Sequence, residues 1–135
     1  MDKYGFVFPG QGSQKLGMLS ELAAEYPIID QSFAQASETL GLDLWQICQY
    51  DSDNILDRTD ITQPALLTAS VAIWRLWQQQ SGTTPAILAG HSLGEYSALV
   101  CAGVLSFADA VLAVHKRGQF MQDAVPPGEI GRAHV

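Results

Sequence analysis

The stretch PAILAGHSLGEYSALVCAG, residues 85–103, decides the fold of this chain. Its first five residues are an apolar run that predicts a buried strand. The segment 93–103 predicts a helix that is apolar nearly all round, with Glu95 as its only charge, so we expect it to be buried. Gly90-His91-Ser92-Leu93-Gly94 lies between the two, and a G-x-S-x-G turn joining a strand to a helix is typical of a nucleophile elbow.

The elbow predicts a reactive serine at position 92. The two glycines allow a strained turn and a close approach of the surrounding backbone. Such a turn lifts the serine Oγ onto the N-terminus of the next helix, where backbone N–H groups can stabilise a developing oxyanion. This arrangement indicates acyl-enzyme chemistry but does not separate a hydrolase from a transferase.

Outside this stretch, the sequence predicts one further strand and several helices, and it contains no internal repeat. Asp43, Thr62 and Ser106 are the predicted helix caps, and Ser106 forms a capping box with Asp109. Pro64 is expected in the first turn of its helix, where a missing N–H costs nothing. The predicted elements are a strand over 4–8, helices over 18–25, 28–40, 44–48, 63–80 and 106–124, and an acidic surface loop over 50–60. This order predicts an α/β fold with at least two neighbouring parallel strands.

Composition limits the classes of function. Hydrophobic residues make up 47% and charged residues 16%, which is typical of a globular domain, and the net charge of −7 argues against a nucleic-acid partner. No apolar run approaches the ~20 residues of a membrane span, and no leader is seen, so we expect a cytoplasmic protein without a membrane partner. Cys48 and Cys101 have no metal-ligand spacing and are expected to be buried, reduced thiols; no metal is predicted.

A cation is predicted on the apolar face of the last helix. Arg117 follows Ala110 by seven residues and therefore points the same way, whereas Lys116 points elsewhere. A guanidinium on an apolar face needs a partner, and a carboxylate bound through two hydrogen bonds is the natural one. The residues alone leave a structural salt bridge or an arginine that reaches out to solvent as alternatives.

Four motifs, in order and spacing, resemble the malonyl-CoA:acyl carrier protein transacylase family. They are FVFPGQGSQ at 6–14, TQPAL at 62–66, GHSLGEYSA at 90–98 and RG at 117–118. The resemblance spans residues 4 to about 127. It implies a hydrolase-like parallel-sheet core, and a small ferredoxin-like subdomain that this chain does not contain.

The resemblance also implies roles for single residues. Ser92 is similar to the nucleophile that carries malonyl as an ester, and the backbone N–H groups of Gln11 and Leu93 to the oxyanion hole. Arg117 is similar to the residue that holds the malonyl carboxylate, and Gln63 matches a glutamine near the active site, although it could serve only as a helix cap. The implied substrate is malonyl-CoA, the acceptor is the phosphopantetheine thiol of acyl carrier protein, and no cofactor is bound.

The general base that such a serine requires has no good candidate in this sequence. His91 precedes Ser92 on the strand and should point away from it, His115 lies in mid-helix, and His134 lies in an aperiodic tail. In the family the catalytic histidine lies farther downstream. We therefore expect residues 1–127 to be the incomplete N-terminal part of an acyltransferase domain, inactive as it stands.

The C-terminal tail has no periodicity, and the sequence also leaves other functions open. Residues 129–135 can be encoded by a common sequencing adapter, so 128–135 is predicted to be a non-native tail, with a genuine tail as the alternative. The alternatives to a fatty-acid transacylase are an esterase or thioesterase, a polyketide-synthase acyltransferase, and a non-enzymatic interaction module. The arginine and the loop at 9–14 argue against the hydrolase.

Overall fold

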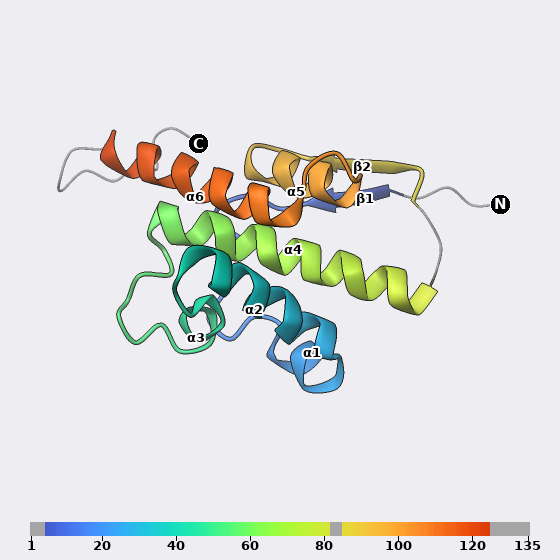
Figure 1. Ribbon diagram of the computed structural model, residues 1–135, viewed down its shortest axis with the longest axis horizontal. Coiled ribbons are helices and arrows are strands. Elements are labelled where there is room, and N and C mark those ends of the chain that lie inside the picture. The colour runs from blue at the N-terminus through green and yellow to red at the C-terminus, as the bar shows by residue number, and fades with distance from the viewer. Residues whose placement is uncertain (1–4, 82–84, 125–135) are drawn as a thin grey trace.

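The computed structural model describes residues 5–81 and 85–124, which form two strands and six helices (Figure 1). The strands are β1 (Gly5–Phe8) and β2 (Ile87–Gly90). The helices are α1 (Ser20–Glu25), α2 (Pro27–Leu40), α3 (Leu44–Gln49), α4 (Thr59–Ser81), α5 (Leu93–Cys101) and α6 (Phe107–Asp123). The predicted α/β class is confirmed.

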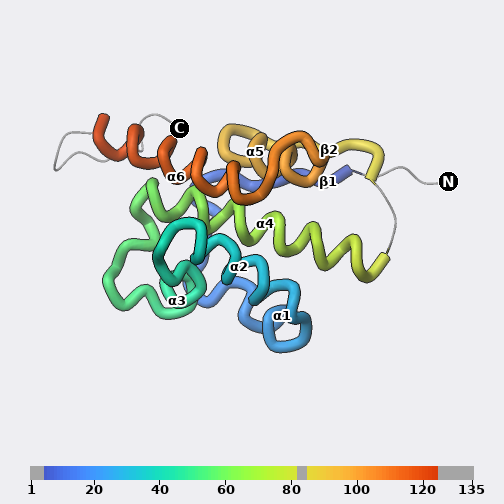
Figure 2. The backbone as a smooth tube through the Cα atoms, viewed as in Figure 1, coloured from blue at the N-terminus to red at the C-terminus, as the bar shows by residue number. Residues whose placement is uncertain are grey.

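The two strands pair in parallel, with Gly5 opposite Ile87 and Phe8 opposite Gly90. Parallel strands bring their carboxyl ends to the same edge, so the loop after β1 and the turn after β2 leave the sheet side by side. Figure 2 shows α5 and α6 on the same side of α4 as the strands, and α1, α2 and α3 on its other side. The predicted parallel pair is confirmed, and its register brings together the two loops on which the site is built.

Helix α4 is the centre of the core. Every residue from Asp60 to Ala72 is buried, because α2 packs on one side of the helix and α5 and α6 on the other. On one face of the helix Leu67, Val71 and Trp74 are buried, whereas Trp77 is half-buried and Gln78 is exposed. In the described part of the chain, no helix is long and apolar enough to cross a membrane.

The start of α4 differs from the prediction. The helix begins at Thr59, and Thr62 does not cap it: its hydroxyl donates to the carbonyl oxygens of Leu56 and Arg58. Pro64 therefore lies in the second turn, where its missing N–H does cost a helical hydrogen bond. The other caps are confirmed, because Asp43 and Ser106 accept hydrogen bonds from the backbone N–H three residues on.

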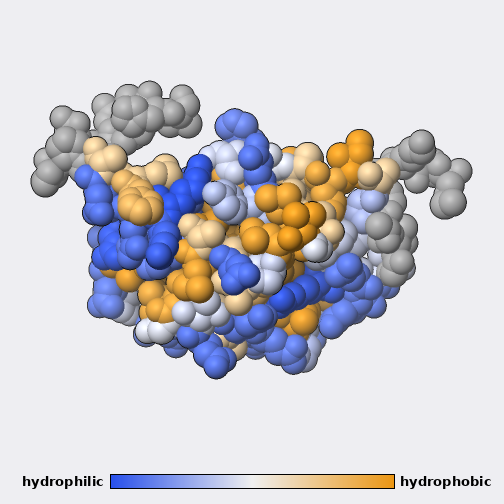
Figure 3. Space-filling view, turned by 45° about the horizontal axis from the view of Figure 1, so that its top comes forward, coloured by the Kyte–Doolittle hydropathy of each residue, from blue (hydrophilic) through white to orange (hydrophobic). Residues whose placement is uncertain are grey.

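The burial expected for α5 is incomplete in the described chain. Only Leu93, Gly94 and Ser97 of α5 are buried, and Leu99 is 42% exposed. The space-filling view brings forward the side of the molecule on which α5 and α6 lie, and apolar side chains are visible on its surface (Figure 3). In the described chain, α4, α6 and the two strands cover only part of its apolar surface.

The two thiols are unpaired, but they are not equally buried. Cys48 is fully buried, as predicted, whereas Cys101 is only half-buried. Burial raises the pKa of each thiol to about 12. Both therefore stay protonated at neutral pH and are poor nucleophiles.

Candidate active site

The turn after β2 has the backbone of a nucleophile elbow. Ser92 adopts φ 58° and ψ −116°, a conformation that a residue with a side chain rarely takes. A Cβ on Gly90 would lie 2.1 Å from the carbonyl of Gly94, so the strand end and the first turn of α5 are in backbone contact. The strain at Ser92 and the tight glycine contact both result from this sharp reversal, which leaves Ser92 exposed.

The loop after β1 lies directly beside the elbow. A Cβ on Gly94 would lie 2.2 Å from the carbonyl oxygen of Phe8, so α5 starts against the end of β1. A Cβ on Gly10 would lie 3.4 Å from the carbonyl oxygen of His91. The structure thus brings the predicted oxyanion loop and the predicted nucleophile together at one edge of the sheet.

Two glutamines attach this loop to the start of α4 and to the segment just before it. Gln11 Nε2 donates to Oγ1 of Thr59 at 3.1 Å, and Gln14 Nε2 donates to Oδ1 of Asp57 at 2.9 Å. The Gln11 side chain is thereby turned towards α4, which leaves its backbone N–H as the group it could offer to a substrate. Leu93 is buried as the first residue of α5, and its N–H is one of the four at a helix start that have no acceptor within the helix.

Arg117 contacts both the predicted nucleophile and Gln63. Its Nη2 donates to Oγ of Ser92 at 3.0 Å, and its Nη1 donates to Oε1 of Gln63 at 2.7 Å. Gln63 is fully buried, and its Nε2 donates to Sδ of Met121 at 3.2 Å, which fixes the orientation of the amide. The capping alternative for Gln63 is therefore wrong, because its side chain holds the arginine.

Two features of the Arg117 site were not anticipated. Tyr96, four residues after Ser92, places its ring centroid 5.9 Å from the guanidinium carbon. A tyrosine one turn after an elbow serine was the signal available in the sequence. Among the described residues, no carboxylate lies within ion-pair distance of Arg117, so the alternative of a structural salt bridge has no partner there. The site combines a serine hydroxyl with a guanidinium held by neutral groups.

The described histidines do not act on Ser92 in this structure. His91 is exposed in the turn, and its carbonyl oxygen accepts a hydrogen bond from Gly94 N at 3.1 Å. His115 donates instead to the backbone of α4, through Nδ1 to the carbonyl oxygen of Asp60 at 2.8 Å. His134 and the predicted tail at 128–135 lie outside the described residues.

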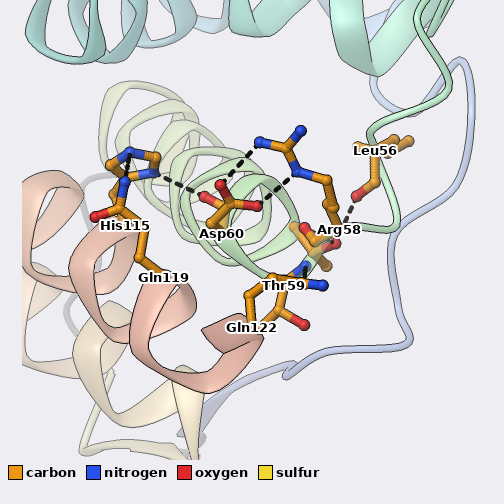
Figure 4. Close-up of polar contacts among 8 residues, drawn as sticks. Leu56, Arg58, Thr59, Asp60, His115, Gln119 and Gln122 are labelled. Carbon is orange, nitrogen blue, oxygen red and sulfur yellow. Dashed lines mark hydrogen bonds and ion pairs between the residues drawn. The ribbon is translucent and has the colours of Figure 1, made fainter. Parts of the chain in front are cut away.

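Asp60 contacts Arg58 through its carboxylate and His115 through its backbone carbonyl. Arg58 binds the Asp60 carboxylate through Nε at 3.0 Å and Nη2 at 2.9 Å, and His115 approaches Asp60 from the opposite side (Figure 4). The hydrogen bonds from Arg58 hold the pKa of the Asp60 carboxyl below its usual range, although burial acts in the opposite direction. The carboxylate thus stays ionised at the start of α4, where the helix dipole also favours it.

Replacing Arg58 should make the fold more sensitive to acid. A carboxyl with a lowered native pKa adds stability above its unfolded pKa of about 3.9, and this is lost as the pH falls through the native value. In Arg58→Gln the native pKa of Asp60 rises, so the acid-unfolding midpoint should move up by about half a pH unit. Circular dichroism against pH measures it. Lys116→Gln removes the same charge elsewhere and should leave the midpoint in place.

Comparison with known proteins finds a matching family and similar sequences. The profile of the family described as the acyl transferase domain matches residues 5–134. A malonyl CoA-acyl carrier protein transacylase of Salmonella typhimurium is 62% identical over 135 residues, which is 100% of this chain and 44% of the relative. One from Bacillus subtilis is 51% identical over 135 residues, covering 100% of this chain and 42% of the relative.

Solved structures give the same result. An acyl carrier protein S-malonyltransferase from Vibrio cholerae superposes with a TM-score of 0.90 at 60% identity, covering 94% of this chain and 42% of that one. A malonyl-transacylase in complex with a type II PKS acyl-carrier protein gives a TM-score of 0.90 at 57% identity, covering 94% and 41%. The chain spans less than half the length of these relatives. On the family profile, these identities and the elbow, the chain belongs to the acyl transferase domain family.

Proposed function

We propose that this chain is the N-terminal part of a malonyl-CoA:acyl carrier protein transacylase of fatty-acid synthesis. The observation that carries the proposal is the contact between Ser92 at a nucleophile elbow and Arg117 held by Gln63. A simple hydrolase of neutral esters has no use for a guanidinium directed at its serine. A substrate whose acyl group ends in a free carboxylate does, and malonyl is such a group.

The proposed chemistry has two acyl-transfer steps. Ser92 Oγ attacks the thioester carbonyl of malonyl-CoA, the carbon–sulfur bond breaks, and the CoA thiol leaves with the proton. The phosphopantetheine thiol of acyl carrier protein then attacks the ester, and Ser92 regains its proton as malonyl leaves on sulfur. In both steps the N–H groups of Gln11 and Leu93 stabilise the oxyanion, each contributing about 3 kcal/mol.

The remaining part of the family's domain is proposed to supply the base. Ser92 needs a histidine within hydrogen-bond reach, and the two described histidines are engaged elsewhere or have no contact with it. We further propose that the two-stranded sheet is one part of a hydrolase-like core, to which the missing part adds strands and the ferredoxin-like subdomain. The exposed apolar residues Leu99, Val104 and Ile87 support a larger fold around α5 and the sheet.

The test uses a joined enzyme, residues 1–124 of this chain followed by the part of the Salmonella relative that aligns after residue 124 and continues to its C-terminus. Incubated with malonyl-CoA, it should form a malonyl ester on the peptide that contains Ser92 and pass it to holo acyl carrier protein. The ester should persist in water until the carrier thiol is added. Rapid hydrolysis without carrier would favour the esterase alternative, and robust transfer by the 135-residue chain alone would show that it contains its own base.

Arg117→Ala in the joined enzyme should change the choice of substrate. Acetyl lacks the free carboxylate, so only malonyl transfer loses a charge-assisted pair. Truncating one partner of such a pair costs ~2–5 kcal/mol, so the ratio of malonyl to acetyl kcat/KM should fall by about 1.5 to 3.5 decades. Steady-state assays with both CoA esters measure it, and Lys116→Ala on the neighbouring exposed position is the matched control. Equal losses for the two substrates would make Arg117 purely structural.

A further inference from the structure

Pro64 leaves one carbonyl of α4 without its helical donor. In an uninterrupted helix the N–H of residue 64 would donate to the carbonyl oxygen of Asp60, but proline has no N–H. Asp60 is a buried residue, and an unsatisfied carbonyl there would be destabilising. The structure fills this position from another helix, because Nδ1 of His115 lies 2.8 Å from that oxygen.

The contact defines the state of the imidazole. A carbonyl oxygen only accepts, so Nδ1 of His115 carries the hydrogen and donates it. The other ring nitrogen, Nε2, lies 3.3 Å from Nε2 of Gln119, one turn further along α6 (Figure 4). The amide nitrogen donates to it, which fits a neutral ring that uses both nitrogens. His115 is therefore fixed at both ends, to its own helix and to the backbone of α4.

A second contact brings α6 against the same residue of α4. Gly118 is buried, and a Cβ on it would lie 2.5 Å from Cα of Asp60 and 2.6 Å from the carbonyl oxygen of Thr59. A glycine contact sets the distance between two helices, but it offers no side chain to stop one helix from turning about its axis. At 100° per residue, His115 and Arg117 lie on opposite sides of Gly118 around α6.

The His115 bond therefore constrains where Arg117 points, together with the hydrogen bonds that α4 donates to Met121 and Gln122 of α6. Any rotation of α6 about the Gly118 contact that breaks the His115–Asp60 bond also moves the start of the Arg117 side chain on the other side. Gln63, which holds Arg117, is three residues after Asp60 and on the adjacent turn of α4. Both hydrogen bonds of the guanidinium, at 2.7 Å and 3.0 Å, depend on this relation between the two helices.

We propose that His115 is a positioning residue for substrate selection: by donating to the carbonyl that Pro64 leaves open, it fixes the rotation of α6 and so holds Arg117 between Gln63 and Ser92. It touches neither the substrate nor the serine. The expected effect of His115 on substrate selectivity rests on the proposed function. Its effect on the position of the Arg117 guanidinium does not depend on that function.

A substitution at Pro64 separates two roles of His115. The first is to satisfy the Asp60 carbonyl, and the second is to hold α6 in the orientation that places Arg117. His115→Leu removes the donor, so in the joined enzyme the unfolding constant should rise about five- to a hundredfold. The malonyl to acetyl ratio should fall by about tenfold or more. Pro64→Ala with His115→Leu restores an N–H to the Asp60 carbonyl from within α4 but leaves α6 without its hydrogen bond to that carbonyl. This double variant should regain stability and keep the reduced ratio.

Two further variants complete the set. Pro64→Ala alone keeps both donors and is the reference for the double variant, in particular if His115→Leu does not fold. His115→Asn places an amide N–H near the Nδ1 position and should keep the ratio within about threefold of its parent. If the double variant recovers the ratio together with the stability, His115 merely satisfies a carbonyl and the proposal is overturned.

A measurement without substrate distinguishes a failure of this proposal from a failure of the proposed function. The hydrogen-bonded Nη protons of Arg117 should exchange slowly with water in nitrogen-15 NMR spectra of the joined enzyme. They should exchange faster in the double variant than in Pro64→Ala. Unchanged exchange would refute positioning even if malonyl transfer is confirmed, and faster exchange would support it even if the natural acyl group is not malonyl.

Discussion

Ser92→Ala should abolish formation of the malonyl-enzyme in the joined enzyme. The elbow exposes one hydroxyl above the start of α5, and its Oγ is the atom to which Arg117 donates at 3.0 Å. Alanine leaves the backbone and the proposed oxyanion donors in place but removes the atom that forms the ester. Loss of a nucleophilic serine costs up to about six decades in kcat, so transfer should fall below detection.

The decisive measurement is the mass of the peptide that spans the elbow after incubation with malonyl-CoA. Ser52→Ala, in the exposed acidic loop before α4, is the matched control and should label like the parent. Alanine also has a Cβ, so the positive φ at position 92 is as strained as before, and a difference in stability does not confound the comparison. Stoichiometric label on another residue of the alanine variant would refute the assignment.

Gly94→Ala should disrupt the elbow itself. The added Cβ would lie 2.2 Å from the carbonyl oxygen and 3.0 Å from the carbonyl carbon of Phe8, and both are backbone atoms that cannot turn away. Relief requires α5 to move off the end of β1, which separates Leu93 from the Gln11 loop. We expect the free energy of unfolding to fall by more than about 3 kcal/mol, and acylation of any molecules that still fold to be largely lost.

Gly10→Ala is the control for this substitution. Its Cβ would lie 3.4 Å from the nearest atom, the carbonyl oxygen of His91, which is ordinary contact. Urea unfolding of both variants in the joined enzyme gives the comparison. A Gly94→Ala protein as stable as Gly10→Ala would show that the strand end and α5 are farther apart than this structure places them.

The parts of the fold that were predictable are those determined by local chemistry. The elbow, the Asp43 and Ser106 caps and the parallel pair of strands each follow from a short pattern and were found where expected. The start of α4 was missed because Thr62 resembles a cap before a proline, whereas tertiary packing extends the helix back to Thr59. Tertiary contacts here outweigh a local signal that is worth only about 1 kcal/mol.

The site was predictable in its residues but not in its connections. Arg117 was placed on the correct face of α6 from its spacing alone, yet its neutral partner Gln63 and its neighbour Tyr96 come from other helices. The role of His115 depends on a carbonyl that Pro64 leaves open on α4, and no periodicity in α6 could reveal that. Contacts between distant segments depend on how whole helices cross, which a single sequence does not specify.

The positive φ at Ser92 has an evolutionary consequence. A residue with a Cβ costs of order 1–3 kcal/mol in such a conformation, whereas glycine enters it freely. If Ser92 is the nucleophile, selection for turnover maintains a residue that selection for folding alone would discard. A lineage released from catalysis would gain stability by drifting to glycine at this position. Glycine at position 92 in an otherwise intact sequence would therefore mark a descendant that kept the fold and abandoned the reaction.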